Sequence, residues 1–448
     1  MPYRFSFVPS RTPLLFPFLG ALAATPLAAC STSEGAGSGG SADTSTSSTM
    51  GAGGSTAAAR VIVRDHAGRP AVGVDILVHD PTGATTQQTK TDATGAAVVD
   101  LAAGGGVTAL YKSARENSAP GYSAVSVIGL AGGAEVRLVA DPDVATDVPL
   151  PMNLSFTGVP PLLPAGWDIV TSCHQETMAS ETSLAYGGCA GSSTYDLVAF
   201  LSSGDQRIVF AAQPDQPGKS VPFQLDPAKA EAAPRIEVNV TGMPAGASTL
   251  EARLSANRPE GGRTQVSIFQ SPIQPQGTLL KIPRLPVSTG GTFDLDVSVD
   301  TAQGSLLARF PFTAKGLPTS PVAWSALAVP FVTSAGPITG SAQRPEVPWA
   351  IPPGEMPADA VRLVLGYDAA QHPVDWTLYM ASSIGATARF PEIPAAFPGW
   401  TAAPGTSLTV IAEHVDVAGT ASLLAAVNAD FDRTGSSWSS TSFTASAP

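Results

Sequence analysis

Cysteine and histidine are the side chains best suited to chemistry in this sequence, and the chain has only three cysteines and five histidines. Cys173, His174, Glu176 and Cys189 stand in one short stretch and could supply the ligands of a metal site. Zinc sites usually pair closely spaced cysteines, whereas each of these cysteines stands alone. In a secreted chain, two cysteines remaining beyond Cys30 favour a Cys173–Cys189 disulfide over a metal site, so we predict no bound metal or cofactor.

Catalytic motifs are not found in the sequence. No histidine stands in an H-E-x-x-H arrangement, and no serine lies in G-x-S-x-G. His66 follows a turn aspartate, and His79 lies on the polar face of an expected strand, so both are predicted to be exposed. These patterns predict a protein that is not an enzyme, although catalytic residues can lie far apart in sequence and a hydrolase built that way stays an alternative.

Asn428, Asp430 and Asp432 resemble the start of a calcium-binding loop. An EF-hand loop needs glycine at its sixth position and glutamate at its twelfth, but these positions hold Arg433 and Ser439. We therefore expect a solvated acidic loop, with a calcium site of another geometry as the alternative.

Aromatic side chains that stack on sugar rings are the remaining candidates for binding. Trp349 and Trp400 lie in proline-rich surroundings and are the tryptophans best placed for exposure and for contact with a ligand. The favoured interpretation is still that each tryptophan fills a core, because one buried tryptophan per β-sandwich is common. The six tryptophans are Trp167, Trp324, Trp349, Trp376, Trp400 and Trp438.

The N-terminus carries a strong targeting pattern. Arg4 and Arg11 precede an apolar run over 13–29 that is short and interrupted by prolines, as in a secretory signal peptide. The run ends in Leu27-Ala28-Ala29-Cys30, which resembles the lipobox of bacterial lipoproteins. The resemblance implies cleavage before Cys30, lipid on the Cys30 thiol, and anchoring in a membrane by the acyl chains. In a bacterium with an outer membrane, Ser31 in place of aspartate favours that membrane.

Between the lipobox and the first strand lies a tract made almost entirely of serine, threonine, glycine and alanine, residues 31–59. Such a tract buries too little apolar area to offset its ordering entropy, so we expect a disordered tether. A flexible coil of this length spans roughly 30 Å on average.

Composition favours an all-β protein. Hydrophobic residues make up 44% of the chain and charged residues 13%, while 44 glycines and 41 prolines punctuate short strands and disfavour long helices. Only short turns are expected in the alanine-rich stretches 226–233 and 419–427. The net charge of −12 comes without a basic cluster, which excludes nucleic acid as an expected partner.

The first module expected to fold covers residues 60–140. Val61 and Val63 alternate with polar neighbours, Val74, Ile76 and Val78 share a strand face, and turns are predicted at 65–68 and 91–95. The stretch resembles the carboxypeptidase regulatory-like domain, a transthyretin-like β-sandwich, through Val63, Asp65, Gly68, Pro70, Val72, Gly73, Val74, Val78, Thr91, Asp92 and Gly95. It departs from that family at Ala97, where an aromatic is usual. The resemblance implies a non-catalytic accessory module.

The rest of the chain is expected to form further β-sandwich modules, of the immunoglobulin-like or transthyretin-like kind. Alternating strands followed by Gly-x-Pro recur at 152–160 and 236–244, and 293–299 is the cleanest alternation in the chain. One larger β domain over 148–448 is the alternative. The predicted division is a signal peptide 1–29, the lipidated cysteine and tether 30–59, the first sandwich 60–140, and sandwich modules 148–232, 233–320 and 321–448.

Taken together, these patterns predict a lipid-anchored, non-catalytic protein of the bacterial cell envelope with a structural, adhesive or ligand-presenting role. The alternative is a surface lipoprotein that binds a glycan or polysaccharide. Its expected partners are the membrane, through the lipid, and a glycan or another envelope protein.

Overall fold

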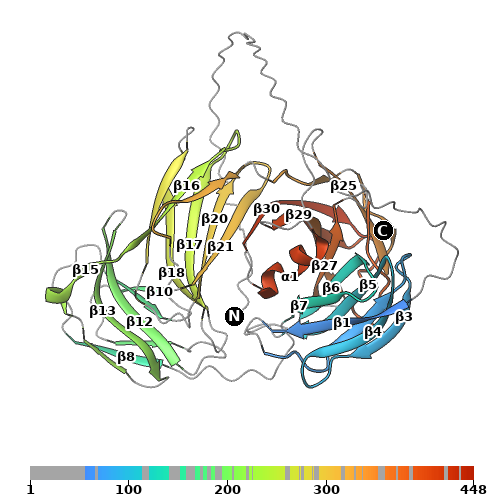
Figure 1. Cartoon of the computed structure of the whole chain (residues 1–448), viewed down its shortest axis with the longest axis horizontal. Coiled ribbons are helices and arrows are strands. Elements are labelled where there is room, and N and C mark those ends of the chain that lie inside the picture. Colours follow the sequence, from blue (N-terminus) through green and yellow to red (C-terminus); the bar gives the residue numbers. More distant parts are fainter. Residues whose placement is uncertain are drawn as a thin grey trace, which may run out of the picture. The chain divides into compact units, whose positions relative to one another are not determined.

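The computed structural model is almost entirely β-structure, in several sheets with one α-helix among the residues it describes (Figure 1). This confirms the prediction of tandem all-β sandwich modules. The structure describes the chain from residue 56 to 448 except 66–68, 114–120, 141–151, 158–166, 172–174, 179–182, 187–193, 204–205, 218–220, 225, 258–262, 272, 274–276, 285, 287–291, 314–317, 327–328, 335, 352–358, 370–371, 383–386, 418–421 and 433–434. In the described part, no helix is long and apolar enough to cross a bilayer.

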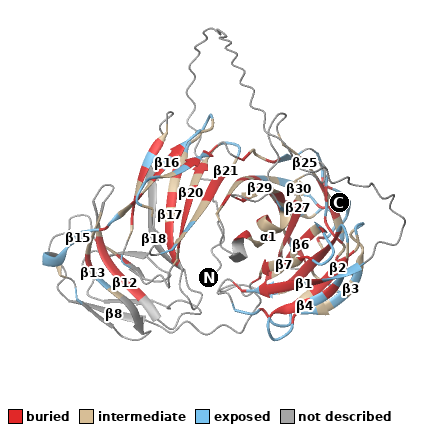
Figure 2. Cartoon of the chain, in the orientation of Figure 1, coloured by how far each residue is buried: buried red, intermediate tan, exposed pale blue. Residues whose placement is uncertain are grey.

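The N-terminal module is a two-layer sandwich. One layer has the order β4-β1-β7, in which β1 (Thr56–Arg64) lies antiparallel to β4 (Ala96–Ala102) and parallel to β7 (Glu135–Val139). The other contains β3 (Thr85–Lys90), β2 (Asp75–His79), β5 (Gly105–Ser113) and β6 (Gly121–Leu130). Buried residues line β1 and β4 (Figure 2). The predicted strand faces are confirmed, because the core includes Val61, Val63, Val74, Ile76 and Val78.

Two turns of this module are built alike. The Asp92 carboxylate accepts hydrogen bonds from the backbone N–H of Thr94 (2.8 Å), the Thr94 hydroxyl (2.7 Å) and the N–H of Ala96 (3.1 Å). Asp80 accepts the same three bonds in its own turn, four residues before Ala84. In each turn the threonine hydroxyl is the main cause that lowers the pKa of the aspartate. The sequence predicted the Asp92 turn but not the Asp80 turn.

We expect Gly95→Ala to destabilise the protein by more than about 1 kcal/mol. Gly95 has φ of 73°, and a Cβ there would lie 2.5 Å from the Val63 carbonyl oxygen, so both the backbone and the contact oppose a side chain. Gly73 is a matched control, because its φ is 76° but a Cβ would meet no atom within 4 Å. Urea unfolding followed by circular dichroism should show the larger loss for Gly95→Ala, and equal losses would contradict the steric contribution.

The largest sheet has twelve strands and joins segments that are far apart in sequence. Its order is β18-β17-β20-β21-β30-β29-β26-β27-β6-β5-β2-β3. The strands not yet given are β17 (Thr249–Asn257), β18 (Arg263–Ser271), β20 (Thr292–Asp300), β21 (Ser305–Thr313), β26 (Ala360–Ala369), β27 (His372–Ala381), β29 (Ser407–Val417) and β30 (Ser436–Ser446). The N-terminal module enters this sheet through a parallel pairing of β6 with β27, and the 249–313 strands enter through the antiparallel pairing of β21 with β30.

The central part of the chain forms three smaller sheets, with orders β10-β9-β12-β13-β15, β11-β8-β14 and β19-β16-β22. Their strands are β8 (Met152–Thr157), β9 (Trp167–Thr171), β10 (Gln175–Met178), β11 (Ser183–Tyr186), β12 (Thr194–Ser203), β13 (Gln206–Pro217), β14 (Val221–Gln224), β15 (Glu231–Ala232), β16 (Arg235–Thr241), β19 (Thr278–Pro283) and β22 (Val322–Ser325). The alternation predicted for β16 is confirmed, since Ile236, Val238 and Val240 are buried. Val198 and Phe200 of β12 belong to the same core as β16, β17 and β20. The predicted module boundaries stay predictions.

Strand β20 departs from the predicted alternation. Phe293, Leu295, Val297 and Val299 are buried as expected, but Asp294 and Asp296 on the opposite face are also buried, each at 5% exposure. Asp296 is covered because Arg309 of β21 pairs with it at 2.8 Å, and the Arg309 guanidinium lies over the Trp438 ring of β30. The second face of this strand is therefore closed by neighbouring strands rather than left to solvent.

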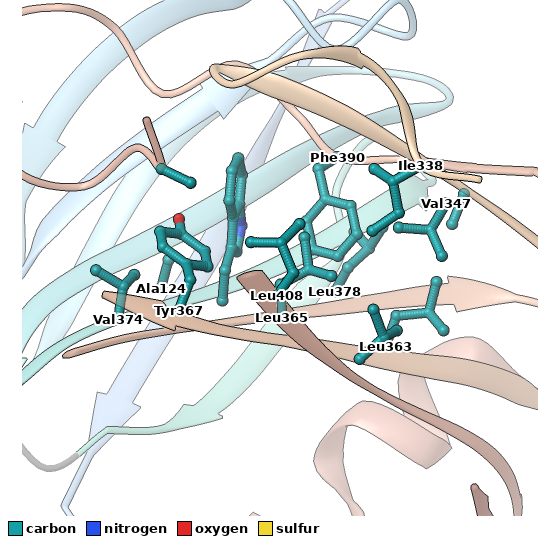
Figure 3. Packing of buried hydrophobic residues seen from close by; sticks show 14 of the residues in the cluster. Ala124, Ile338, Val347, Leu363, Leu365, Tyr367, Val374, Leu378, Phe390 and Leu408 are labelled. Carbon is teal, nitrogen blue, oxygen red and sulfur yellow. The ribbon is translucent and has the colours of Figure 1, made fainter. Parts of the chain in front are cut away.

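The C-terminal part of the chain, which we call the C-terminal domain, adds a small cover of short strands to the large sheet: β23 (Thr333–Ser334), β24 (Thr339–Ser341), β25 (Arg344–Ala350) and β28 (Thr387–Arg389). Its core lies between this cover and the sheet, and Figure 3 shows Ile338, Val347 and Phe390 gathered with sheet residues such as Leu378. Leu77, Leu110 and Ala124 of the N-terminal module belong to the same core. The N-terminal module and the C-terminal domain thus share one hydrophobic core.

One prediction about helices is wrong. Residues 419–427 were expected to form a short turn at most, but α1 (Leu423–Asp432) is a ten-residue helix, whereas 226–233 does contain only a 3₁₀ turn, η1 (Pro227–Lys229). The Ser422 hydroxyl caps α1 by accepting the N–H of Ala425 at 3.1 Å. The alanines of the helix pack against β29, and Asn428 accepts the backbone N–H of Arg137 in β7 at 3.0 Å. Packing against two sheets stabilises a helix whose own periodicity gave little signal.

Candidate functional site

Strand β2 carries a buried histidine where the sequence predicted an exposed one. His79 is 1% exposed. The expectation was wrong because the second face of β2 does not meet solvent: Leu77 on that face packs with Phe390 in the core of the C-terminal domain. Burial of an imidazole usually requires hydrogen bonds for its ring nitrogens.

His79 lies in the middle of a chain of buried hydrogen bonds. Its Nε2 lies 2.8 Å from the Thr108 hydroxyl of β5, and that hydroxyl lies 2.8 Å from the Ser126 hydroxyl of β6. Trp376 of β27 donates its Nε1–H to the Ser126 hydroxyl at 2.9 Å. On the other side of the ring, Nδ1 lies 3.3 Å from the Thr85 hydroxyl of β3. The chain crosses the parallel seam between β6 and β27.

The two ends of this chain set the direction of every proton in it. Thr85 donates to the Glu392 carbonyl at 2.9 Å, so its oxygen accepts from His79 Nδ1–H, and Nε2 of a neutral ring then accepts from the Thr108 hydroxyl. Because the Thr108 proton is used in this bond, Ser126 donates to Thr108 and accepts from Trp376, whose indole N–H can only donate. This arrangement satisfies all the groups when the imidazole is neutral with its proton on Nδ1.

The electrostatics around His79 agree with that neutral state. Burial is the main cause that lowers its pKa to about 4; the neighbouring Asp80 carboxylate opposes the shift and the Arg344 guanidinium adds to it. Among the described residues, Asp80 makes no hydrogen bond to the ring, and its Oδ1 accepts three donors of its own turn. The site therefore holds a neutral imidazole among neutral hydroxyls, which suits positioning of strands rather than acid–base catalysis.

The turn that follows β2 is held by the cover of the C-terminal domain. Glu392 donates its backbone N–H to the Gly83 carbonyl at 2.9 Å, and the Arg344 guanidinium donates to the Thr82 carbonyl. With the Thr85–Glu392 bond, these contacts tie residues 82–85 to the C-terminal domain on the side opposite the β6–β27 seam. We call this set, together with the His79 hydrogen-bond chain, the interdomain lock.

A second polar site lies where α1 covers the large sheet. Arg362 of β26 and Glu413 of β29 form an ion pair at 2.7 Å, and Glu413 is only 8% exposed. The Arg362 guanidinium also lies over the Tyr379 ring, 5.7 Å from its centre. A small pocket here is lined by Arg362, Tyr379, Glu413, Val415, Ala426, Ala429, Ser436 and Trp438. Since the two charges neutralise one another, the site serves packing of α1 more readily than binding of a charged ligand.

Trp349 and Trp400, the tryptophans that the sequence singled out as the better candidates for exposure, lie in the core. Trp349 is 4% and Trp400 is 6% exposed, as the favoured core interpretation predicted. Strand β25 lies over the main sheet with Trp349 turned inward, and Trp400 packs edge-on against Tyr122 with ring centres 4.9 Å apart. Pro345 and Pro348, which precede Trp349, lie within strand β25 of this cover. Trp438 is the tryptophan that retains partial exposure.

Several predicted residues cannot be placed. Cys30, Cys173, Cys189, His66 and His174 lie outside the described residues, so the lipidation and the disulfide stay predictions.

The expected acidic loop at 428–432 is instead part of helix α1, which rules out the loop geometry that suggested calcium. Within the part that the structure describes, no group of three or more His, Cys, Asp or Glu side chains could hold a metal ion.

None of the members of the interdomain lock was singled out by the sequence for that role. Thr85, Thr108, Ser126 and Trp376 are unremarkable residues of separate strands, and only the pairing of β6 with β27 brings the last two together. Polar residues inside apolar strand segments were the one available signal.

Comparison with known proteins identifies no family. No family model and no curated protein matches the chain. Among solved structures, "The Bacillus anthracis TIE protein" is similar over 60% of this chain and 50% of that one, with 12% identity and a TM-score of 0.17. A streptococcal ancillary pilin is similar over 60% of this chain and 98% of that one, with 8% identity and a TM-score of 0.15. The chain thus spans about half the length of the first of these proteins, and scores at this level carry no argument about function.

Proposed function

We propose that this chain is a lipid-anchored, non-catalytic protein of the bacterial cell envelope with a structural or adhesive role. The observation that supports this role most directly is the continuity of the large sheet. It runs from the N-terminal module, where the tether enters, through the C-terminal domain to the strands of 249–313. In this proposal, the paired strands and buried cores connect the anchored N-terminal module mechanically to the rest of the protein.

The polar side chains of the described part support the same role. His79, Thr108 and Ser126 are engaged in holding two modules together, and Arg362 with Glu413 joins strands β26 and β29 of the large sheet. The glycan-binding alternative depended on Trp349 and Trp400 as exposed stacking surfaces, and both side chains are in the core. The lipobox residues 27–30 and the tract 31–59 supply the anchor and the spacing from the membrane in this proposal.

We expect Cys30→Ser to move the protein from the membrane fraction to the soluble fraction, because serine offers no thiol for the lipid. Ser31→Ala is the matched control and should stay with the membrane. Mass spectrometry of the N-terminal peptide should find acyl chains on the wild type and on Ser31→Ala only. A Cys30→Ser protein that remains in the membrane fraction at the wild-type level would show that the anchor is not this cysteine.

A further inference from the structure

We propose that the interdomain lock is acid-sensitive and that His79 is its trigger: protonation of the imidazole breaks the contact between the N-terminal module and the C-terminal domain. The inference goes beyond the proposed envelope role and does not depend on lipid anchoring. It rests on the direction of the hydrogen bonds around the ring.

The hydrogen-bond chain around His79, with its present donor and acceptor directions, cannot accommodate a second proton on the imidazole. It would turn Nε2 into a donor, and Thr108 would have to reverse and donate its hydroxyl proton to Ser126. Ser126 would then accept from both Thr108 and Trp376, and its own proton would have no acceptor in the chain, because the indole N–H only donates. A charged ring therefore leaves a buried hydroxyl unsatisfied, in addition to the cost of burying the charge.

No neighbouring element supplies a counter-charge bonded to the ring. Around His79, β3, β5 and β6 present the hydroxyls of Thr85, Thr108 and Ser126, and the 390–393 segment presents the Glu392 carbonyl to Thr85. The charged groups that influence the ring are Asp80, whose Oδ1 is occupied by its own turn, and the cationic Arg344 of β25.

Proton uptake is therefore coupled to opening. Once β2 separates from the 390–393 segment, water can solvate the ring and the imidazolium becomes favourable at its ordinary pKa near 6.5. Because the open state binds the proton and the closed state does not, the ratio of open to closed protein rises as the pH falls below that value. One proton gives a rise of up to about tenfold per pH unit, continuing toward pH 4, where the closed state also becomes protonated.

The test is hydrogen–deuterium exchange of the full-length protein at several pH values, corrected for the intrinsic exchange rate. For the wild type, amides of β2, β3 and β27 should open progressively more between pH 6.5 and pH 4. His79→Gln should abolish this rise, because the amide side chain can donate to Thr85 and accept from Thr108 but does not titrate. His414→Gln is the matched control. It removes another buried imidazole that takes no part in the His79 hydrogen-bond chain, and it should keep the rise in exchange at β2 and β3.

Two results would overturn the proposal: a wild type whose β2 and β3 amides show no such rise, or a His79→Gln variant that retains it. If His79→Gln does not fold at pH 7, nitrogen-15 NMR of the wild-type ring decides. At pH values well above 4 we expect neutral His79 with its proton on Nδ1 in the closed protein, and an imidazolium at those pH values in a protein whose β2 amides remain protected would contradict the lock.

Discussion

Replacing Trp376 with alanine should lower the free energy of unfolding by about 3–5 kcal/mol, the usual cost of removing a large aromatic side chain from a core. Trp376 is 0% exposed and meets Phe390 edge-on with ring centres 4.9 Å apart. It also donates the hydrogen bond to Ser126 that begins the His79 chain. Its removal leaves a cavity at the seam between β6 and β27 and a hydroxyl without its donor.

Trp376→Phe separates these two effects. Phenylalanine keeps much of the ring volume but has no N–H, so we expect a smaller loss of about 1–3 kcal/mol. Trp438→Phe is the control, because Trp438 is partly exposed, and its effect should be smaller still. Urea unfolding followed by far-ultraviolet circular dichroism measures all three. A loss for Trp376→Ala below about 1 kcal/mol would mean that the indole does not fill this core.

Acidification from pH 7 to pH 4 should remove on the order of 3 kcal/mol of stability through His414 alone. His414 is 0% exposed, and neither ring nitrogen has a hydrogen-bond partner in the described part of the chain. Burial lowers its pKa to about 4, and the Pro330 backbone carbonyl opposes this shift through a contact with the ring that falls short of full hydrogen-bond geometry; the same carbonyl accepts the Ser439 hydroxyl. The unfolded chain binds a proton near pH 6.5 and the folded chain near pH 4, so stability is complete above pH 6.5 and falls as the pH drops toward 4.

His414→Leu should abolish this contribution and, at pH 7, raise the free energy of unfolding by about 1–3 kcal/mol, because it removes buried polar atoms that make no hydrogen bonds. His372→Leu is the control: His372 is only half-buried and should leave the acid dependence of stability in place. Thermal unfolding between pH 4 and pH 7 measures both. A His414→Leu protein that is less stable than the wild type at pH 7 would show that the ring nitrogens are satisfied after all.

Much of the strand content could be predicted because burial on one face imposes a period of two on the sequence. Val61 and Val63 in β1, and Ile236 and Val238 in β16, show this alternation and are buried as it predicts. This period-two pattern does not predict which strands pair, since any strand of suitable length can lie beside any other. That is why the parallel pairing of β6 with β27, across some 250 residues of chain, could not be anticipated.

The errors have one physical cause. His79 and Asp296 were each judged from their local surroundings, which suggested exposure, and each is buried by contacts that only the folded sheets provide. Helix α1 was missed for a related reason: its alanine-rich sequence has little amphipathic pattern, and contacts with β7 and β29 stabilise it.

What the sequence determined alone is local: the class of the fold, most strand faces, the Asp92 turn, and the expectation of a lipid on Cys30 ahead of a flexible tract. These depend on neighbours along the chain, where side-chain type and spacing act directly. Tertiary structure alone decided that the N-terminal module and the C-terminal domain share a core and that His79, Thr108, Ser126 and Trp376 form one hydrogen-bond chain. Burial and proton direction are properties of the assembled neighbourhood, because both depend on groups that only folding brings within hydrogen-bonding distance.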